Sequence, residues 1–429
     1  MKHKSFGALL SRLFGRAQSG FYIQLGGFVL AFALSLFLTN FYGADEYGYY
    51  VLIFSTVEIL AVFSMMGYNQ LFSIHIPQFG NRKGKIASLY EKGRRATLRN
   101  SIIFMVLAVL ATLYYPFKEE VIRYLVLCGA FMIPVLALST LKSAFLYSIR
   151  KHFWTQLNER IFRISLFLLI TFVLLWLSGA KLWHLIAAFS TSTVVSLVVV
   201  SLLKRSLFDR SEVSESFESR SVRNSIFLLV IINLIGVLFA RTDTFMVAYF
   251  LGADYSGVNN IYLKIASVMG LLMSGAMVSA SPKISHYLGK GQLGRIRREL
   301  RRVHFLTFPL GILMLIGIVL IAPFILEWYA SEIYVTEVKA LNIYSITALL
   351  DLFTGPAAVI LMLGGKLKQL ILGYSLEFVL NLILNAILIP EFQIEGAAWA
   401  TLISELSVNL YFAYICLRTL RVNTLLIGN

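Results

Sequence analysis

The sequence FYGADEYG at residues 41–48 returns in similar form as FLGADYSG at residues 250–257. The shared pattern is F-x-G-A-D-x-x-G, and the two copies lie 209 positions apart. The same offset pairs Gly27 with Gly236. Because this offset is close to half of the 429 residues, the pattern indicates two homologous halves fused end to end.

The composition is that of a membrane protein. Hydrophobic residues make up 58% of the chain and charged residues only 14%, whereas about 25% of residues are charged in a soluble domain. Several apolar runs reach the ~20 residues that a bilayer span requires. We predict twelve spans, near 21–41, 49–73, 100–115, 121–141, 161–178, 182–203, 224–250, 258–280, 304–328, 340–363, 369–389 and 396–417.

These spans and the repeat predict an all-α polytopic membrane protein built from two pseudo-symmetric six-helix bundles. The bundles are predicted at residues 1–203 and 224–429, and a polar, charged linker at residues 204–223 joins them. In membrane proteins, repeated halves are typical of transporters whose substrate site lies between two lobes.

The positions of the charges predict the orientation. The net charge is +16, and 32 of the 38 Lys and Arg residues fall in seven segments on one side when both termini are placed in the cytoplasm. This asymmetry follows the positive-inside rule and accounts for the charge without nucleic acid as a partner. It also predicts attraction to anionic membrane lipids. We therefore expect a multi-pass protein of the cell inner (cytoplasmic) membrane.

Several classes of function are excluded by what the sequence lacks. No G-x-x-x-x-G-K-[ST] loop occurs, and the six His residues are scattered. The connections between the predicted spans are too short for a catalytic domain. We expect a protein that moves a substrate rather than an enzyme, with no metal and no cofactor.

Ionisable residues inside spans are costly and mark functional sites. Through the repeat offset, Lys264 aligns with Ser55 and Glu58 aligns with Ser267. Positions 55 and 58 share one helix face, so Glu58 and Lys264 are predicted on equivalent faces of opposite lobes. The alternative is that each is satisfied within its own lobe.

Arg241 and Asp243 form a second charged pair of positions. They are two residues apart on a predicted helix, so a mutual salt bridge is not expected. The planar guanidinium of Arg241 suits bidentate contact with phosphate. The alternative is a brace between Arg241 and a carboxylate such as Asp351.

Three further acids, Asp351, Glu377 and Glu405, are candidates for ion coupling. Asp351 precedes the helix-breaking Gly355-Pro356, and an acid next to a break suits a proton or ion site. Glu377 begins a polar stripe with Asn381 and Asn385, and Glu405 pairs similarly with Asn409. The alternative is that these stripes hold the last two spans together by hydrogen bonds.

Two longer stretches carry a family resemblance. Residues 241–257, RTDTFMVAYFLGADYSG, followed by Lys264, resemble the seventh and eighth helices of lipid-linked oligosaccharide flippases. Residues 389–401, IPEFQIEGAAWAT, resemble the end of the same proteins. These are the Wzx-type polysaccharide exporters of the multidrug/oligosaccharidyl-lipid/polysaccharide superfamily, and the resemblance covers essentially the whole chain.

The resemblance implies two MATE-like bundles around a cationic cavity that binds the sugar–diphosphate head of an undecaprenyl-linked oligosaccharide. It implies that Arg241 and Lys264 are cavity cations, that Asp243 orients or balances them, and that Arg163 lies near the cytoplasmic mouth. Glu58 is a further candidate substrate contact. A proton or cation is the implied coupling ion. The implied role is surface polysaccharide synthesis, such as O-antigen, alongside a polymerase and chain-length machinery.

Two alternatives remain from the sequence. A drug or cation antiporter of the related toxin-extrusion family would share the fold, but usually depends on an acid in the first helix, and residues 21–40 contain none. A membrane-embedded polymerase or ligase would need a long outward loop, which the predicted topology lacks. Lipid II flippases are also similar but usually have fourteen spans.

Overall fold

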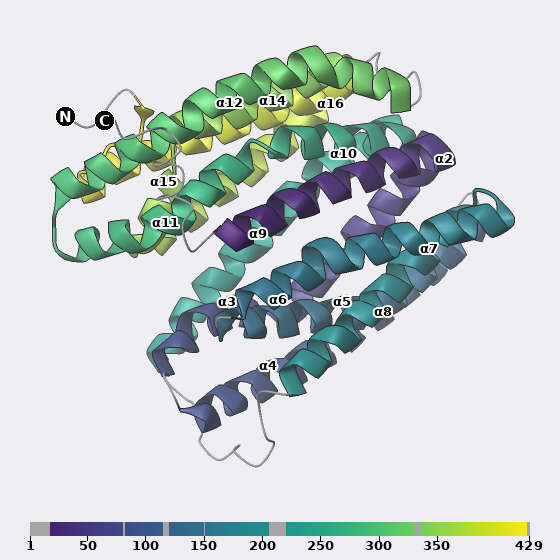
Figure 1. Ribbon diagram of the computed structural model, residues 1–429, viewed down its shortest axis with the longest axis horizontal. Coiled ribbons are helices and arrows are strands. Elements are labelled where there is room, and N and C mark those ends of the chain that lie inside the picture. The colour runs from purple at the N-terminus through teal and green to yellow at the C-terminus, as the bar shows by residue number, and fades with distance from the viewer. Residues whose placement is uncertain are drawn as a thin grey trace. The chain divides into compact units, whose positions relative to one another are not determined.

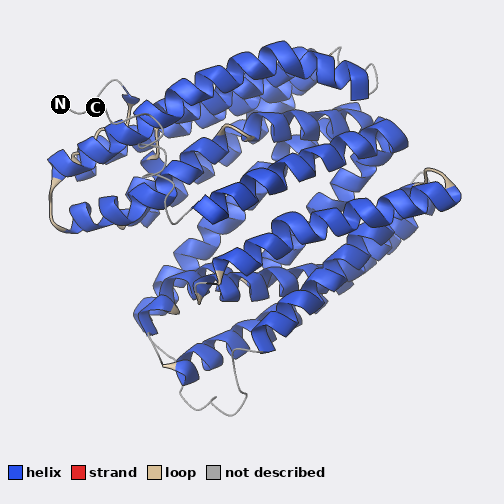
Figure 2. Cartoon of the chain, in the orientation of Figure 1, coloured by secondary structure: helices blue, strands red, loops and turns tan. Residues whose placement is uncertain are grey.

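A computed structural model describes residues 18–79, 82–114, 120–149, 151–205, 220–329, 334 and 337–426. Within these ranges every regular element is a helix, and no strand occurs (Figures 1 and 2). The N-terminal basic segment before residue 18 and most of the predicted linker, residues 206–219, lie outside the described residues.

The number of helices that could cross a membrane can be compared with the twelve predicted spans. Within the described ranges, eight helices are long and apolar enough to cross a membrane, or ten if each of two bent pairs is one span. Two of the eight candidate spans, Tyr22–Met65 with 44 residues and Leu367–Leu420 with 54 residues, contain a break. At 1.5 Å per residue each exceeds twice the ~30 Å hydrocarbon thickness. If each crosses twice, the number reaches the predicted twelve.

The chain forms two compact units whose boundaries lie inside helices. Unit 1 comprises Met1–Ala44 and Phe239–Asn429, and unit 2 comprises Asp45–Leu238. α2 (Gln18–Met65) passes from one unit to the other next to Gly43, whose φ of 86° interrupts the helix. α9 (Arg220–Leu251) passes back between Leu238 and Phe239. The division of the sequence at residues 204–223 stays a prediction.

Unit 2 is built around packed aromatic side chains. Its elements, besides parts of α2 and α9, are α3 (Tyr68–His75), η1 (Pro77–Phe79), α4 (Lys83–Tyr114), α5 (Glu120–Ser148), α6 (His152–Gln156), η2 (Leu157–Phe162), α7 (Arg163–Ser178) and α8 (Leu182–Arg205). Phe72, Tyr90 and Phe145 form one buried cluster, with 4.5 Å between the last two ring centroids. A Cβ at Gly93 would lie 2.8 Å from the Phe72 ring, so α3 and α4 approach closely there.

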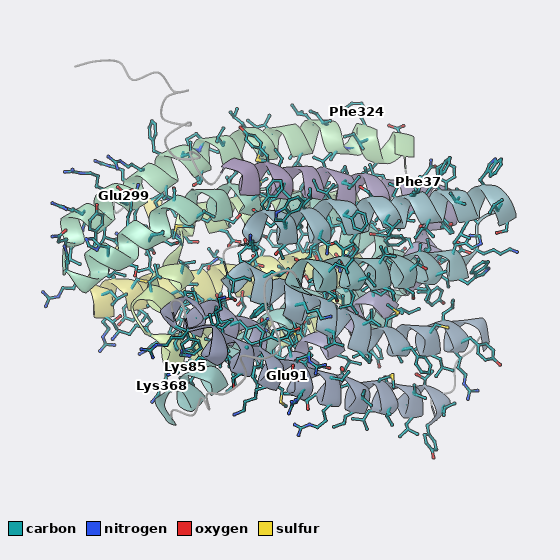
Figure 3. The ribbon with its side chains drawn as sticks, turned by 60° about the horizontal axis from the view of Figure 1, so that its bottom comes forward. Phe37, Lys85, Glu91, Glu299, Phe324 and Lys368 are labelled. Carbon is teal, nitrogen blue, oxygen red and sulfur yellow. The ribbon has the colours of Figure 1, made fainter. Side chains whose placement is uncertain are left out.

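Unit 1 contains the remaining helices. They are α10 (Ala253–Ser267), α11 (Gly270–Gly289), α12 (Leu293–Tyr329), α14 (Val338–Thr354), α15 (Ala357–Leu363), α16 (Leu367–Ile415) and η4 (Cys416–Leu420). α14 packs against α10, α12 and α16. In Figure 3, Glu299 lies near the start of α12 and Phe324 towards its other end. Most charged residues of α12 thus lie in its N-terminal part, and most of the rest of the helix is apolar.

Breaks in the helices of unit 1 shape its interior. The predicted interruption at Gly355-Pro356 is confirmed, because α14 and α15 are bent by 44° there and Gly355 has a φ of 76°. α10 and α11 are bent by 41° within the predicted eighth span, a break that the sequence analysis did not anticipate.

The last break lies in α16 after Pro390, where Gln393 has a φ of 54°. A Cβ at Gly396 would lie 2.2 Å from the Leu388 carbonyl oxygen. Glycine is therefore needed for the two arms of α16 to approach this closely.

Candidate ion and substrate sites

Asp243 is the buried centre of a polar cluster inside unit 1. It lies on α9 with 6% of its surface exposed. The side chains around it come from α14 and from both arms of α16. Asn381 and Asn385 face it together because residues four apart share one face of a helix. The kink in α16 brings Thr401 back to the same point of unit 1.

Four neutral groups contact the Asp243 carboxylate. Asn385 Nδ2 donates to Oδ1 at 2.8 Å and Asn381 Nδ2 donates to the same oxygen at 3.3 Å. The hydroxyls of Thr401 and Tyr344 contact Oδ2, the latter at 3.3 Å. An uncompensated buried charge would be very costly. Here two amides and two hydroxyls donate hydrogen bonds to the carboxyl oxygens.

The cluster has spare hydrogen-bonding capacity. Asn385 Oδ1 and Asn259 Nδ2 are buried without a hydrogen-bond partner. The Tyr344 hydroxyl also contacts Asn259 Oδ1 at 2.8 Å, and its single proton serves only one acceptor at a time. One carboxylate together with amide and hydroxyl oxygens is a ligand set suited to a hard cation. We therefore regard the Asp243 cluster as a candidate cation site.

A second acidic region lines a cavity of about 580 Å³ in unit 1. Asp351 from α14 and Glu377 and Glu405 from α16 all contribute to its wall. Asn409 Nδ2 donates to Asp351 Oδ1 at 2.5 Å, and the Asp351 and Glu405 carboxyl groups are hydrogen-bonded to each other. Two carboxyl groups can share a hydrogen bond only when one holds a proton. This acidic cavity therefore suits proton binding.

The two polar stripes on α16, Glu377–Asn381–Asn385 and Glu405–Asn409, have different hydrogen-bond partners. Asn381 bonds Thr401 on the other arm at 3.3 Å, so this stripe does link the last two spans. Asn381 and Asn385 also donate to Asp243, for which the resemblance implied a role in orienting or balancing Arg241 and Lys264. Asn409 binds Asp351 on α14, which gives the Glu405–Asn409 stripe a partner on another helix.

The predicted substrate cations lie in unit 1. Lys264 on α10 donates from Nζ to Ser35 Oγ of α2 at 2.6 Å, and both Lys264 and Arg241 are half-buried. This hydrogen bond holds the ammonium group of Lys264 against α2.

The other two predicted substrate contacts lie in unit 2. Glu58 is on α2 after its break and is half-buried. Arg163 is the first residue of α7 and follows the π-helical turn η2. The predicted pairing of Glu58 with Lys264 and the position of Arg163 at a cavity mouth stay predictions.

Sequence reasoning missed several members of these sites. Tyr344, Asn259 and Thr401 were not assigned to the Asp243 cluster, since a lone hydroxyl or amide on an apolar helix is common. Asn381 and Asn385 were recognised only as part of a polar stripe with Glu377, and their contact with Asp243 was not predicted. Across the described residues, no group of three or more His, Cys, Asp or Glu side chains is arranged to hold a metal ion.

Known structures share this fold. An inward-facing multidrug resistance MATE family transporter of the MOP superfamily superposes with a TM-score of 0.72, at 11% identity, over 92% of this chain and 95% of that chain. The lipid II flippase MurJ, in an inward closed conformation, gives a TM-score of 0.66 at 14% identity, over 93% of this chain and 86% of that chain. The protein is thus a multi-pass membrane protein with the MATE transporter fold, and the predicted fold class is confirmed.

Two sequence matches agree with the fold. Residues 229–387 match the model of the MatE family. A curated protein of Haloferax volcanii, "Probable flippase AglR", is 28% identical over 174 residues, which are 40% of this chain and 37% of the relative. The match thus spans little more than a third of AglR. The expected superfamily is supported, whereas the Wzx type within it stays a prediction.

Proposed function

We propose that the protein is a secondary transporter that flips an undecaprenyl-diphosphate-linked oligosaccharide from the cytoplasmic to the outer leaflet. Transport proceeds by alternating access around a cationic site that includes Arg241 and Lys264. The product serves surface polysaccharide synthesis, such as O-antigen, and a polymerase with chain-length machinery consumes it. The protein acts in the inner membrane with both termini in the cytoplasm, and Arg163, Glu58 and Asp243 contribute to substrate binding.

The Asp243 cluster is the observation that supports ion-coupled transport best. A buried carboxylate with only neutral donors changes its interactions strongly when a cation or proton binds. Asp351, Glu377 and Glu405 provide a second set of groups that a coupling ion can reach. The gradient of that ion is the energy source, consistent with the absence of a P-loop from the sequence.

The substrate class rests on charge and on the name of one relative. Lys264, whose Nζ donates to the Ser35 hydroxyl, and Arg241 are the two basic side chains proposed to meet an anionic ligand. A diphosphate in a low-dielectric site needs such fixed cations. The segment matched in AglR, which is named a probable flippase, supports the flipping of a lipid.

A drug or cation antiporter is the second candidate, and a specific observation favours it. The acidic cavity of unit 1, with Asp351, Glu377 and Glu405 in its wall, suits a cationic substrate. The similar MATE structure is a multidrug resistance transporter. In this alternative, the same three carboxylates bind drug and proton in turn.

A deletion strain distinguishes the two functions. We expect surface polysaccharide to be lost and single lipid-linked units to accumulate on the cytoplasmic leaflet. Normal surface glycan together with new sensitivity to cationic dyes would instead establish the antiporter.

Charge variants test the proposed substrate site. Lys264→Ala and Arg241→Ala should each reduce export at unchanged protein level, whereas Lys264→Arg and Arg241→Lys should retain more. Removal of one charge-assisted contact costs about 1.5–3 kcal/mol, or roughly tenfold to 100-fold in affinity. Parent-like export by all four variants would refute the cationic site.

A further inference from the structure

One exposed face of α4 carries a row of basic side chains that are not part of the proposed transport site. Ser88, Lys92, Arg95 and Arg99 are spaced by three or four residues, so they lie along one face of the helix. The three cations cover about 10 Å along the axis. All three are exposed, and the predicted topology places them on the cytoplasmic side, just before the apolar part of α4.

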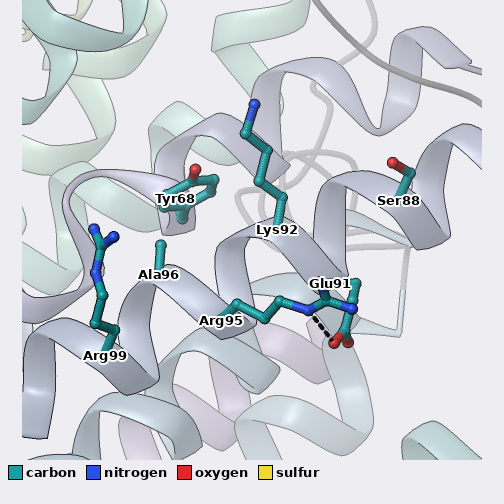
Figure 4. A pocket seen from close by; sticks show the side chains of 7 residues that line it. All are labelled: Tyr68, Ser88, Glu91, Lys92, Arg95, Ala96 and Arg99. Atoms are coloured by element: carbon teal, nitrogen blue, oxygen red, sulfur yellow. Dashed lines mark hydrogen bonds and ion pairs between the residues drawn. The ribbon is translucent and has the colours of Figure 1, made fainter.

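These side chains line a pocket of about 480 Å³ (Figure 4). Tyr68 of α3 contributes its ring to the wall, and Ala96 leaves space between the cations. In Figure 4, Lys92 and Arg99 extend from α4 on the same side as Tyr68, whereas Arg95 extends along the helix to Glu91. The pocket thus offers an ammonium, two guanidinium groups and a phenol to one ligand.

The carboxylate in the pocket is already neutralised. Glu91 accepts hydrogen bonds from Arg94 Nε at 2.9 Å and from Arg94 Nη2 at 2.6 Å. Arg95 adds only its Nε, at 3.0 Å, and its side chain is 77% exposed. The remaining donors of Arg95 are available to a ligand. Since Arg94 compensates Glu91, the pocket itself carries a surplus of about three positive charges.

The same face continues into the membrane as an apolar row. Its exposed members follow Arg99 at the same spacing and are Ile102, Ile103, Val106, Leu107, Leu110 and Leu113. A basic pocket followed directly by an exposed apolar row matches an amphiphile with a strongly anionic head and a hydrocarbon tail. A head with two negative charges fits the charge surplus better than a head with one.

We propose that this α4 pocket binds the diphosphate head of the lipid-linked substrate on the cytoplasmic side, with the polyprenyl tail along the apolar row. Lys92 and Arg99 contact the phosphate oxygens, Arg95 contributes its free Nη atoms, and Tyr68 borders the first sugar. This docking site rests on the proposed function. Its residues belong to unit 2, whereas Arg241 and Lys264 belong to unit 1.

Binding to reconstituted full-length protein tests the pocket. The probe is undecaprenyl diphosphate titrated into phosphatidylcholine nanodiscs, and the variant is Lys92→Ala/Arg95→Ala/Arg99→Ala. We expect saturable binding to the parent and at least about tenfold weaker binding to the variant. Arg82→Ala/Lys83→Ala/Arg160→Ala is the matched control, since it removes three exposed cations that do not line the pocket. It should bind like the parent.

The outcomes separate the site from the function. Parent-like binding by the pocket variant would overturn the docking site and leave the flippase proposal intact. Displacement of the probe by an equal mole fraction of phosphatidylglycerol would also overturn it, because the pocket would then select ordinary anionic lipid. Absence of saturable binding to the parent would count against both proposals. Selective loss in the pocket variant, with the control unchanged, would support the docking site.

Discussion

The Asp243 cluster and the acidic cavity lie in the same unit but use carboxylates in opposite ways. At the cluster, one buried carboxylate is surrounded by neutral amides and hydroxyls. In the cavity, Asp351 and Glu405 are hydrogen-bonded to each other, with Glu377 in the same wall. Tyr344 and Thr401 belong to both regions. The chemistry of an intramembrane acid is therefore set by the groups that surround it.

This contrast suggests that the Asp243 cluster binds a metal cation and the acidic cavity binds a proton. A single carboxylate among oxygen ligands suits a hard alkali cation, whereas a hydrogen-bonded pair of carboxyl groups suits a proton. We expect cation dependence to follow Asp243 and pH dependence to follow Glu405. Three measurements test this contrast, and a fourth tests a carboxyl group outside both regions.

The largest effect is expected for Asp243→Asn. The change removes the charge and places an amide NH₂ against groups that already donate. Loss of a charged partner in a buried site costs about 3 kcal/mol or more, equivalent to about 100-fold in cation affinity. The measurement is the rise in Tm of purified protein with Na⁺ concentration, because a ligand of the native state raises Tm. An equal Na⁺ response in parent and variant would remove the cation site from Asp243.

Glu405→Gln should change pH dependence instead. It removes a titrating member of the carboxyl pair and keeps the shape of the side chain. We expect the pH profile of export to become flatter, with activity at its optimum reduced about tenfold. The Na⁺-dependent rise in Tm should remain that of the parent. If this variant abolished the Na⁺ response as well, the two regions would act as one site.

Tyr344→Phe should have a smaller effect on both regions, because its hydroxyl contacts Asp243 and its side chain lines the cavity. Loss of one neutral hydrogen bond costs about 1 kcal/mol, or about fivefold in cation affinity. The Na⁺ titration of Tm measures this change. Thr347→Val, at another cavity-lining hydroxyl whose hydrogen bond is to Ile343 of its own helix, is the matched control. A control as impaired as Tyr344→Phe would indicate a general packing defect.

The smallest effect concerns a carboxyl group outside the spans. Partial burial, with repulsion from Glu395, raises the pKa of Glu337, and Lys339 opposes this shift. A raised pKa means that the folded state holds the proton more tightly, so folding is favoured as the pH falls and is penalised above the folded pKa. Glu337→Gln should therefore raise Tm at neutral pH, and the gain in free energy of unfolding should be less than about 1 kcal/mol. The difference in Tm between variant and parent should vanish in acid. A lower Tm at neutral pH would contradict this.

The membrane fold was predictable because its signals are strong and local. Long apolar runs specify helices in a bilayer, where backbone groups must be satisfied within the segment. Gly355-Pro356 also predicted its break correctly, because proline removes a backbone hydrogen bond. The bend between α10 and α11 was not predicted, since Val268 and Met269 are ordinary helix residues and the glycine that follows, Gly270, is tolerated within helices.

The sites were only partly predictable. Intramembrane charge identified Asp243, Asp351, Glu377 and Glu405, because each is too costly to keep without a role. Their partners could not be identified in the same way. Thr401 and Tyr344 are ordinary residues on apolar helices, and only their contacts with Asp243 give them a role.

The sequence by itself determined that the chain crosses the membrane repeatedly, that its halves repeat, and which acids are candidates. Burial cost and helix periodicity act locally, so a linear sequence records them. Only the tertiary structure decided that Asp243 is held by Asn381, Asn385 and Thr401 and that Asp351 meets Glu405. These contacts join positions as many as 158 residues apart. They depend on the kink in α16 and on the packing of α9, α14 and α16, which no local signal specifies.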